Sequence, residues 1–149
     1  MTTRHIVLVE DDPLQVEDLT ALLEKAFPGA HVECLDTESR FYDWLDRHLE
    51  SVPDIFVIDI MLRWTDPGPK MKPPPDDVKL GGIQLAGFRC EKRLAVTPQM
   101  RDVPVVFFSV LEEKDVEREI AGHRPIVRFL WKGSQMTLVE MIRSALKPV

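Results

Sequence analysis

Five short apolar runs recur along the chain, each bounded by turn-forming or charged residues. The most apolar lies in the middle, where Ile55 to Ile58 is unbroken and leads into Asp59-Ile60-Met61-Leu62. A strand that is apolar on both faces is typical of the middle of a sheet covered by helices. The runs predict strands over residues 5–9, 31–35, 55–58, 103–108 and 126–131.

The segments between these strands carry the periodicity of amphipathic helices. The first helix, over residues 14–27, starts at Asp12-Pro13 and ends at Pro28-Gly29. Four more helices are expected: one capped by Asp36 or Thr37, one opened by Gly81-Gly82, an exposed charged one over 112–121, and a last one capped by Ser134.

Strands that alternate with helices predict an α/β fold, with a parallel sheet covered on both faces. The 149 residues suffice for one domain with a sizeable core, so a single domain over 1–149 is expected. Residues 63–80 break the pattern, because they hold five of the twelve prolines together with Gly68. This segment is predicted to be a long Pro-rich loop without a helix.

The net charge of −6 and the pI of about 5.2 argue against direct nucleic-acid binding. No apolar run has the length of a membrane helix, and the first residues lead straight into a strand without a signal peptide, so a cytoplasmic protein is expected. The two cysteines, Cys34 and Cys90, are expected to be reduced and buried, and no Cys/His spacing suggests zinc.

Charged and hydroxyl residues follow the predicted strands at the points where they end. Glu10 and Asp11 follow the first strand, Asp59 the third, Ser109 the fourth and Lys132 the fifth. In open α/β sheets, ligands bind beyond the carboxyl ends of the strands. Carboxylates about 4 Å apart repel by about 4 kcal/mol per pair at an effective dielectric near 20, so three together need protons or a cation. Mg²⁺ suits such an all-oxygen set, and the Met61 backbone carbonyl is a further candidate ligand.

This arrangement suits phosphoryl transfer, which depends on positioning and charge neutralisation. Asp59 would be the nucleophile that accepts the phosphoryl group. Lys132 would contact the carboxylate or a phosphoryl oxygen, and Ser109 would donate its hydroxyl to another oxygen. Asp12 is interpreted as an ordinary helix cap. Phe129 fits a plain core position as well as it fits a switch role.

Four segments carry a resemblance to the response-regulator receiver domains of the CheY-like family. They are Val9-Glu10-Asp11-Asp12-Pro13, Asp59-Ile60-Met61-Leu62, residues 105–109 ending in Ser109, and Phe129-Leu130-Trp131-Lys132. The resemblance implies a flavodoxin-like, doubly wound (βα)5 fold with strand order 2-1-3-4-5. It also implies Mg²⁺ at Glu10, Asp11 and Asp59, phosphate transfer to Asp59 from a histidine kinase or phosphotransfer protein, and a switch through Ser109 and Phe129.

The same resemblance implies a signalling module rather than an enzyme, beyond self-catalysed phosphorylation and dephosphorylation. Its output would be a downstream protein or a homodimer formed through the last helix-strand-helix face. Gly133 replaces the proline usual after the lysine, and residues 63–80 form an insert. These departures leave open a pseudo-receiver, an interaction module that ignores phosphate. A haloacid-dehalogenase-type phosphatase is disfavoured, because Met61 stands where a second acid is needed.

Overall fold

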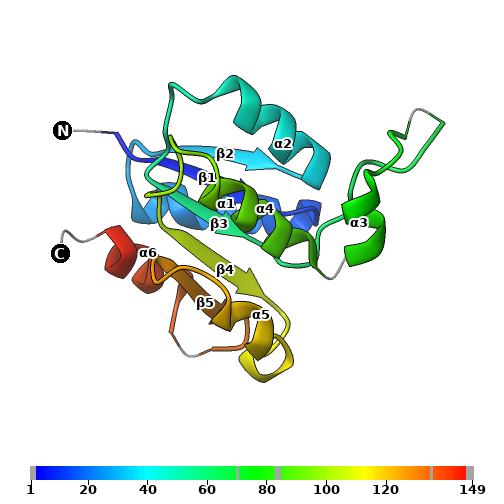
Figure 1. Cartoon of the computed structure of the whole chain (residues 1–149). Helices are drawn as coiled ribbons and strands as arrows, with labels where there is room; N and C mark the ends of the chain where they lie inside the picture. The colour runs from blue at the N-terminus through cyan, green and yellow to red at the C-terminus, as the bar shows by residue number, and fades with distance from the viewer. Residues whose placement is uncertain (1–2, 70, 83–84, 135, 147–149) are drawn as a thin grey trace.

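The five predicted strands form one parallel sheet in the order β2-β1-β3-β4-β5, which confirms the expected fold class (Figure 1). The computed structural model describes residues 3–69, 71–82, 85–134 and 136–146. The strands are β1 (His5–Val9), β2 (His31–Leu35), β3 (Ile55–Ile58), β4 (Val105–Ser109) and β5 (Val127–Trp131). β4 begins two residues later than predicted, just after Pro104, which has no N–H to donate to a ladder.

The described part of the chain has six α-helices, of which five lie between strands and the last follows β5. They are α1 (Pro13–Ala26), α2 (Glu38–Arg47), α3 (Asp76–Gly81), α4 (Ala86–Ala95), α5 (Glu117–Ala121) and α6 (Leu138–Leu146). The side chain of Asp12 caps α1 by accepting from the Leu14 amide at 3.0 Å. Thr37 caps α2 in the same way, by accepting from the Arg40 amide at 3.2 Å. None of the helices in the described ranges has the length and apolar character needed to cross a bilayer.

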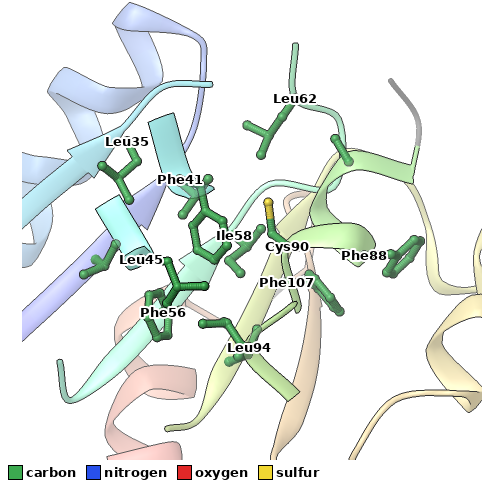
Figure 2. Packing of buried hydrophobic residues seen from close by; sticks show 14 of the residues in the cluster. Leu35, Phe41, Leu45, Phe56, Ile58, Leu62, Phe88, Cys90, Leu94 and Phe107 are labelled. Carbon is green, nitrogen blue, oxygen red and sulfur yellow. The ribbon is translucent and has the colours of Figure 1, made fainter. Parts of the chain in front are cut away.

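Two apolar clusters cover the two faces of the sheet. On one face, α2 and α4 pack over alternate residues of the central strands; Figure 2 shows Phe41 and Leu94 from these helices directed toward Phe56 and Phe107. On the other face, α1 and α6 cover the remaining strand residues, with Leu23 and Ile142 among those fully buried. β3 is buried on both faces along its whole length, as its unbroken apolar run predicts.

The segment 63–80 is not entirely a loop, so this prediction was wrong in part. Its prolines end at Pro75, and α3 begins at the next residue with Asp76 and Asp77 in its first turn. Acidic residues at a helix start are favourable, and no proline follows to interrupt the turn. Gly82 ends α3 with a φ of +66° rather than opening the next helix. Ile83, expected in that next helix, lies outside the described residues.

Three other expectations differ from the structure. The charged segment over 112–121 forms a 3-10 turn (Glu113–Asp115) followed by the five-residue α5, since it has few apolar positions to bury. Thr137, not Ser134, occupies the capping position of α6, where its hydroxyl accepts from the Glu140 amide at 3.1 Å. Cys90 is buried as expected, whereas Cys34 is exposed on the edge strand β2.

The Pro-rich segment and α3 project from one side of the molecule (Figure 1). The first residues of the Pro-rich segment are fixed to α2, because the amides of Glu38 and Ser39 donate to the carbonyls of Arg63 and Trp64 at 3.0 and 2.8 Å. The Trp64 indole donates to the Lys72 carbonyl at 3.1 Å. The segment is therefore held against α2 at its base.

Candidate functional site

The site lies where β1 and β3, neighbours in the sheet, reach their carboxyl ends. Val9 and Ile58 are paired in register, and the Asp59 amide donates to the Val9 carbonyl at 2.9 Å. Glu10 and Asp59 follow these two paired residues. Parallel pairing alone thus places the two acids side by side, although 48 residues of sequence separate them.

Three carboxylates meet at this edge. Glu10, Asp11 and Asp59 each offer an oxygen, and these oxygens all lie within 4.8 Å of one another. Glu10 and Asp59 are buried, at 2% and 8% exposure. Asp11 is half-buried, and its Oδ2 accepts from the Arg63 amide at 3.2 Å and lies 3.5 Å from Arg63 Nε. The structure therefore brings together the acids that the strand ends predicted.

Lys132 extends from the end of β5 to the same acids. Its Nζ lies 3.4 Å from Glu10 Oε2 and 3.6 Å from Asp59 Oδ2, and the side chain is mostly buried. The ammonium group also donates to Gln15 Oε1 on α1 and lies 5.4 Å from the centroid of the Phe108 ring. Lys132 is thus held in place as a cation beside the Asp59 carboxylate.

One lysine does not balance three acids, and the carboxyl pKa values reflect this. Burial raises the pKa of Glu10, and the adjacent Asp59 raises it further, while Lys132 opposes the change. Burial also raises the pKa of Asp59, against the opposing effects of Glu10, Lys132 and the Met61 amide. Glu10 and Asp59 therefore both favour the uncharged, protonated form more than a free carboxyl group does. The site therefore favours additional positive charge.

Ser109 and Phe129, the predicted switch residues, lie on neighbouring strands. Ser109 is fully buried at the end of β4, and its Oγ accepts from the Leu111 amide at 3.1 Å. A hydroxyl that accepts one hydrogen bond still has its own hydrogen to donate. Phe129 packs against the core cluster under α4 and also lines a hollow with Trp131, Met136 and Met141.

Gly133, where the resemblance implies proline, lies beneath an aromatic ring. A Cβ at this position would come within 2.6 Å of the Trp131 ring. The Trp131 indole in turn donates to the Val110 carbonyl at 3.2 Å. The glycine thus allows Trp131 to fold back over the turn that carries Lys132.

Several residues at the site were not predicted from sequence. Gln15 accepts from Lys132, and Arg63 holds Asp11. Gly87, in the first turn of α4, donates its amide to the Ile60 carbonyl at 2.8 Å. Gln15 lies in the first turn of the helix that follows Glu10-Asp11, and this position was the only indication in the sequence that it could reach the site.

Met61 was predicted as a ligand through its backbone carbonyl. Its amide donates to Asp59 Oδ1 at 3.2 Å, and the role of its carbonyl stays a prediction.

Comparison with solved structures identifies the architecture. The signal receiver domain of a histidine kinase from Clostridium thermocellum superposes with a TM-score of 0.70 at 11% identity, covering 99% of this chain and 100% of that one. The receiver domain of a histidine kinase from Syntrophus aciditrophicus gives a TM-score of 0.67 at 22% identity, covering 97% and 90%.

A third structure, the receiver domain of a sensor histidine kinase from Pseudomonas aeruginosa PAO1, has a magnesium ion coordinated in its active site cleft. It gives a TM-score of 0.64 at 15% identity, covering 97% of this chain and 95% of that one. No protein-family model matches the chain, and no curated protein matches it. TM-scores of 0.64–0.70 over nearly whole chains establish a shared fold, although the identities are only 11–22%. The chain therefore has the fold of CheY-like response-regulator receiver domains, as the resemblance of its strand-end motifs implied.

Proposed function

We propose that this chain is a response-regulator receiver that accepts a phosphoryl group on Asp59 and uses it to switch a protein-binding face. The observation that carries the proposal is the meeting of Glu10, Asp11 and Asp59 within 4.8 Å, with the Lys132 ammonium 3.6 Å from Asp59. A nucleophilic carboxylate, a cation-binding acid pair and a fixed ammonium are what phosphoryl acceptance by a side chain requires.

The residues present suit Mg²⁺. All three side-chain donors are carboxylate oxygens, which hard divalent cations prefer over nitrogen or sulfur donors. Two of the carboxyl groups are buried with raised pKa values, so a divalent cation would stabilise their ionised forms. Glu10, Asp11 and Asp59 would hold the ion, with the Met61 carbonyl as a further ligand. When bound, the ion supplies charge neutralisation for the incoming phosphoryl oxygens.

The Asp59 carboxylate would attack the phosphorus atom of a phosphohistidine. A bond forms between a carboxylate oxygen and phosphorus as the P–N bond breaks, and the departing imidazole retains the electron pair and takes up a proton. Asp59 Oδ1 accepts from the Met61 amide and Oδ2 faces Lys132, so the carboxylate is oriented before the donor arrives. Lys132 would remain paired with the new negative charge.

A phosphoryl group adds about −1.5 to −2 charges at the end of β3. The Ser109 hydroxyl, buried at the adjacent strand end, would turn to donate to it, and Phe129 would repack beside it. Phe129 also lines the hollow over β5 and α6, together with Trp131, Met136 and Met141. This face would bind a downstream protein or a second copy of the chain, and a histidine kinase or phosphotransfer protein of the cytoplasm would supply the phosphate.

Incubation with acetyl phosphate, with and without Mg²⁺, tests the proposal. Intact mass spectrometry should show one added phosphoryl group on the wild type only when Mg²⁺ is present, and none on Asp59→Asn. Asp102→Asn changes an exposed aspartate in the turn before β4 and should be phosphorylated like the wild type. If the folded wild type takes up no phosphate under these conditions, the chain is a phosphorylation-independent interaction module of the pseudo-receiver type.

A further inference from the structure

A second group of metal-ligating side chains lies on the edge pair of strands. His5 on β1 and His31 on β2 are partners in the parallel register, so their imidazoles stand side by side with centroids 5.0 Å apart. Glu33 lies two residues along β2 from His31 and so points to the same face of the sheet. His5 and His31 are the first residues of β1 and β2, and Glu33 is the third residue of β2. The two strands lie side by side in the sheet (Figure 1).

The donor atoms of this group converge on one carboxylate oxygen. His5 Nε2 lies 3.1 Å and His31 Nε2 4.0 Å from Glu33 Oε1, and all three donor atoms lie within 4.8 Å of one another. Zinc bonds to histidine and carboxylate ligands of about 2.0–2.2 Å place neighbouring ligands roughly 3.3 Å apart in a tetrahedral site. The observed spacings lie on either side of that value, so small side-chain rotations suffice to surround an ion.

The Glu33 carboxylate is oriented by a hydrogen bond to its second oxygen, as ligands in metal sites commonly are. Glu33 Oε2 accepts a hydrogen bond from the Trp44 indole of α2 at 2.9 Å, which leaves Oε1 directed at the two imidazoles. Trp44 is itself fixed, because it is buried and stacks on the His48 ring at a centroid distance of 4.7 Å. Hydrogen bonds that orient a ligand in this way typically alter metal affinity by 10–100-fold.

We propose that His5, His31 and Glu33 bind a divalent transition metal, with Zn²⁺ as the expected ion. Two imidazoles and one carboxylate form a ligand set that suits zinc and leaves a fourth position for water or a partner's side chain. The His31 side chain is 67% exposed, so solvent reaches the site. One divalent ion would satisfy all three groups at once, whereas protons on both histidines would place two cations side by side.

This site is independent of the acidic cluster at Asp59. It lies at the amino ends of β1 and β2, whereas Glu10 and Asp59 follow the carboxyl ends of β1 and β3. The ligand chemistry also differs, because nitrogen donors select transition metals over Mg²⁺. A bound ion would join the edge strand to β1 and, through Trp44, to α2.

Calorimetric titration of the tag-free, metal-stripped full chain with Zn²⁺ tests the proposal, with Co²⁺ absorption as a report on ligand geometry. We expect one Zn²⁺ site that excess Mg²⁺ does not displace. His31→Gln and Glu33→Gln should each weaken it by at least tenfold, and Trp44→Phe by about tenfold. Bound Co²⁺ should show the intense visible bands of a four-coordinate ion, which His31→Gln should abolish.

Two variants serve as controls. Asp102→Asn removes an exposed carboxylate outside the ligand set, and Asp59→Asn removes the principal acid of the other cluster; both should retain the Zn²⁺ affinity of the wild type. Because His31 is exposed, His31→Gln should keep the wild-type circular dichroism spectrum. Equal Zn²⁺ affinity in wild type and folded His31→Gln would overturn the proposal, as would loss of binding in Asp59→Asn alone.

Discussion

Gly87 lies directly against the backbone of Ile60. A Cβ at residue 87 would stand 2.5 Å from the Ile60 Cα and 2.6 Å from the Asp59 carbonyl oxygen, and the Gly87 amide donates to the Ile60 carbonyl. The first turn of α4 is thereby docked onto the two residues that follow β3. Only a residue without a side chain permits this approach, so the position of the Asp59 main chain depends on Gly87.

Gly87→Ala should therefore destabilise the protein, because the obstructing atoms are backbone and cannot rotate away. We expect a loss of about 1–3 kcal/mol in the free energy of unfolding, measured by urea denaturation. Phosphorylation by acetyl phosphate should also slow as the Asp59 main chain shifts. Gly122→Ala is the matched control, since its nearest neighbour would be 3.6 Å away, and its stability should change by less than about 0.5 kcal/mol.

The acidic cluster should make stability depend on both pH and Mg²⁺. Because burial raises the pKa of Glu10 and of Asp59, the folded metal-free protein keeps protons that the unfolded chain has already released. Its stability should thus fall as the pH rises from about 5 to 8. Mg²⁺ should raise the Tm more at the upper end of this range than at the lower end, measured by thermal melts with and without EDTA.

Asp59→Asn provides the control for that experiment. Removing one buried carboxylate relieves repulsion, so the metal-free variant should melt a few degrees above the wild type, which corresponds to about 1 kcal/mol. Its Tm should respond little to Mg²⁺. If Asp59→Asn is less stable than the wild type in EDTA, the three acids do not repel one another in the folded protein.

The ionised Glu91 side chain should stabilise the folded protein at neutral pH and lose this effect in acid. This side chain of α4 is buried against His123, which bonds to its Oε2, and Arg124, whose Nε donates to Oε1 at 2.8 Å. Burial alone would raise the pKa of Glu91, but the hydrogen bonds and charges of His123 and Arg124 outweigh it and lower the pKa. The unfolded chain therefore binds the proton more tightly, so this contribution is complete above about pH 5 and is lost as the pH falls.

Glu91→Gln should accordingly reduce stability at pH 7 by about 3 kcal/mol, because it leaves two partners without their anion in a buried site. The difference from wild type should shrink in urea melts at acidic pH. Glu119→Gln, an exposed position on α5, should behave like the wild type at both pH values. A Glu91→Gln deficit that stays constant down to pH 3 would contradict the lowered pKa.

The Pro-rich segment should be dispensable for folding. Its side-chain attachments to α2 are exposed ion pairs, Arg40 with Asp66 and Lys72 with Asp43, which contribute little. Replacing residues 65–79 by a short Gly-Ser linker also removes the buried Val78, so a loss of about 1–2 kcal/mol is expected. Circular dichroism and phosphorylation of Asp59 should remain close to wild type. An unfolded product would show that α3 is part of the core.

The sequence alone determined the sheet and the chemistry at its edge. Unbroken apolar runs define buried strands, and acids that follow β1 and β3 must meet once those strands pair in parallel, so Glu10 and Asp59 could be identified in advance. α3 was missed because the prolines before Asp76 dominate the local pattern, and Thr137 was missed as a cap because Ser134 offers the same chemistry three residues earlier.

Only the tertiary structure decided what depends on register and on close approach between distant segments. His5, His31 and Glu33 carry no local signal, since their association depends on how β1 and β2 align. Gly87 looks like any helical glycine until α4 is placed against Ile60. The raised pKa of Asp59 likewise depends on burial among distant groups. Hydrophobic periodicity is a local property of the chain, whereas distances between side chains are set by packing.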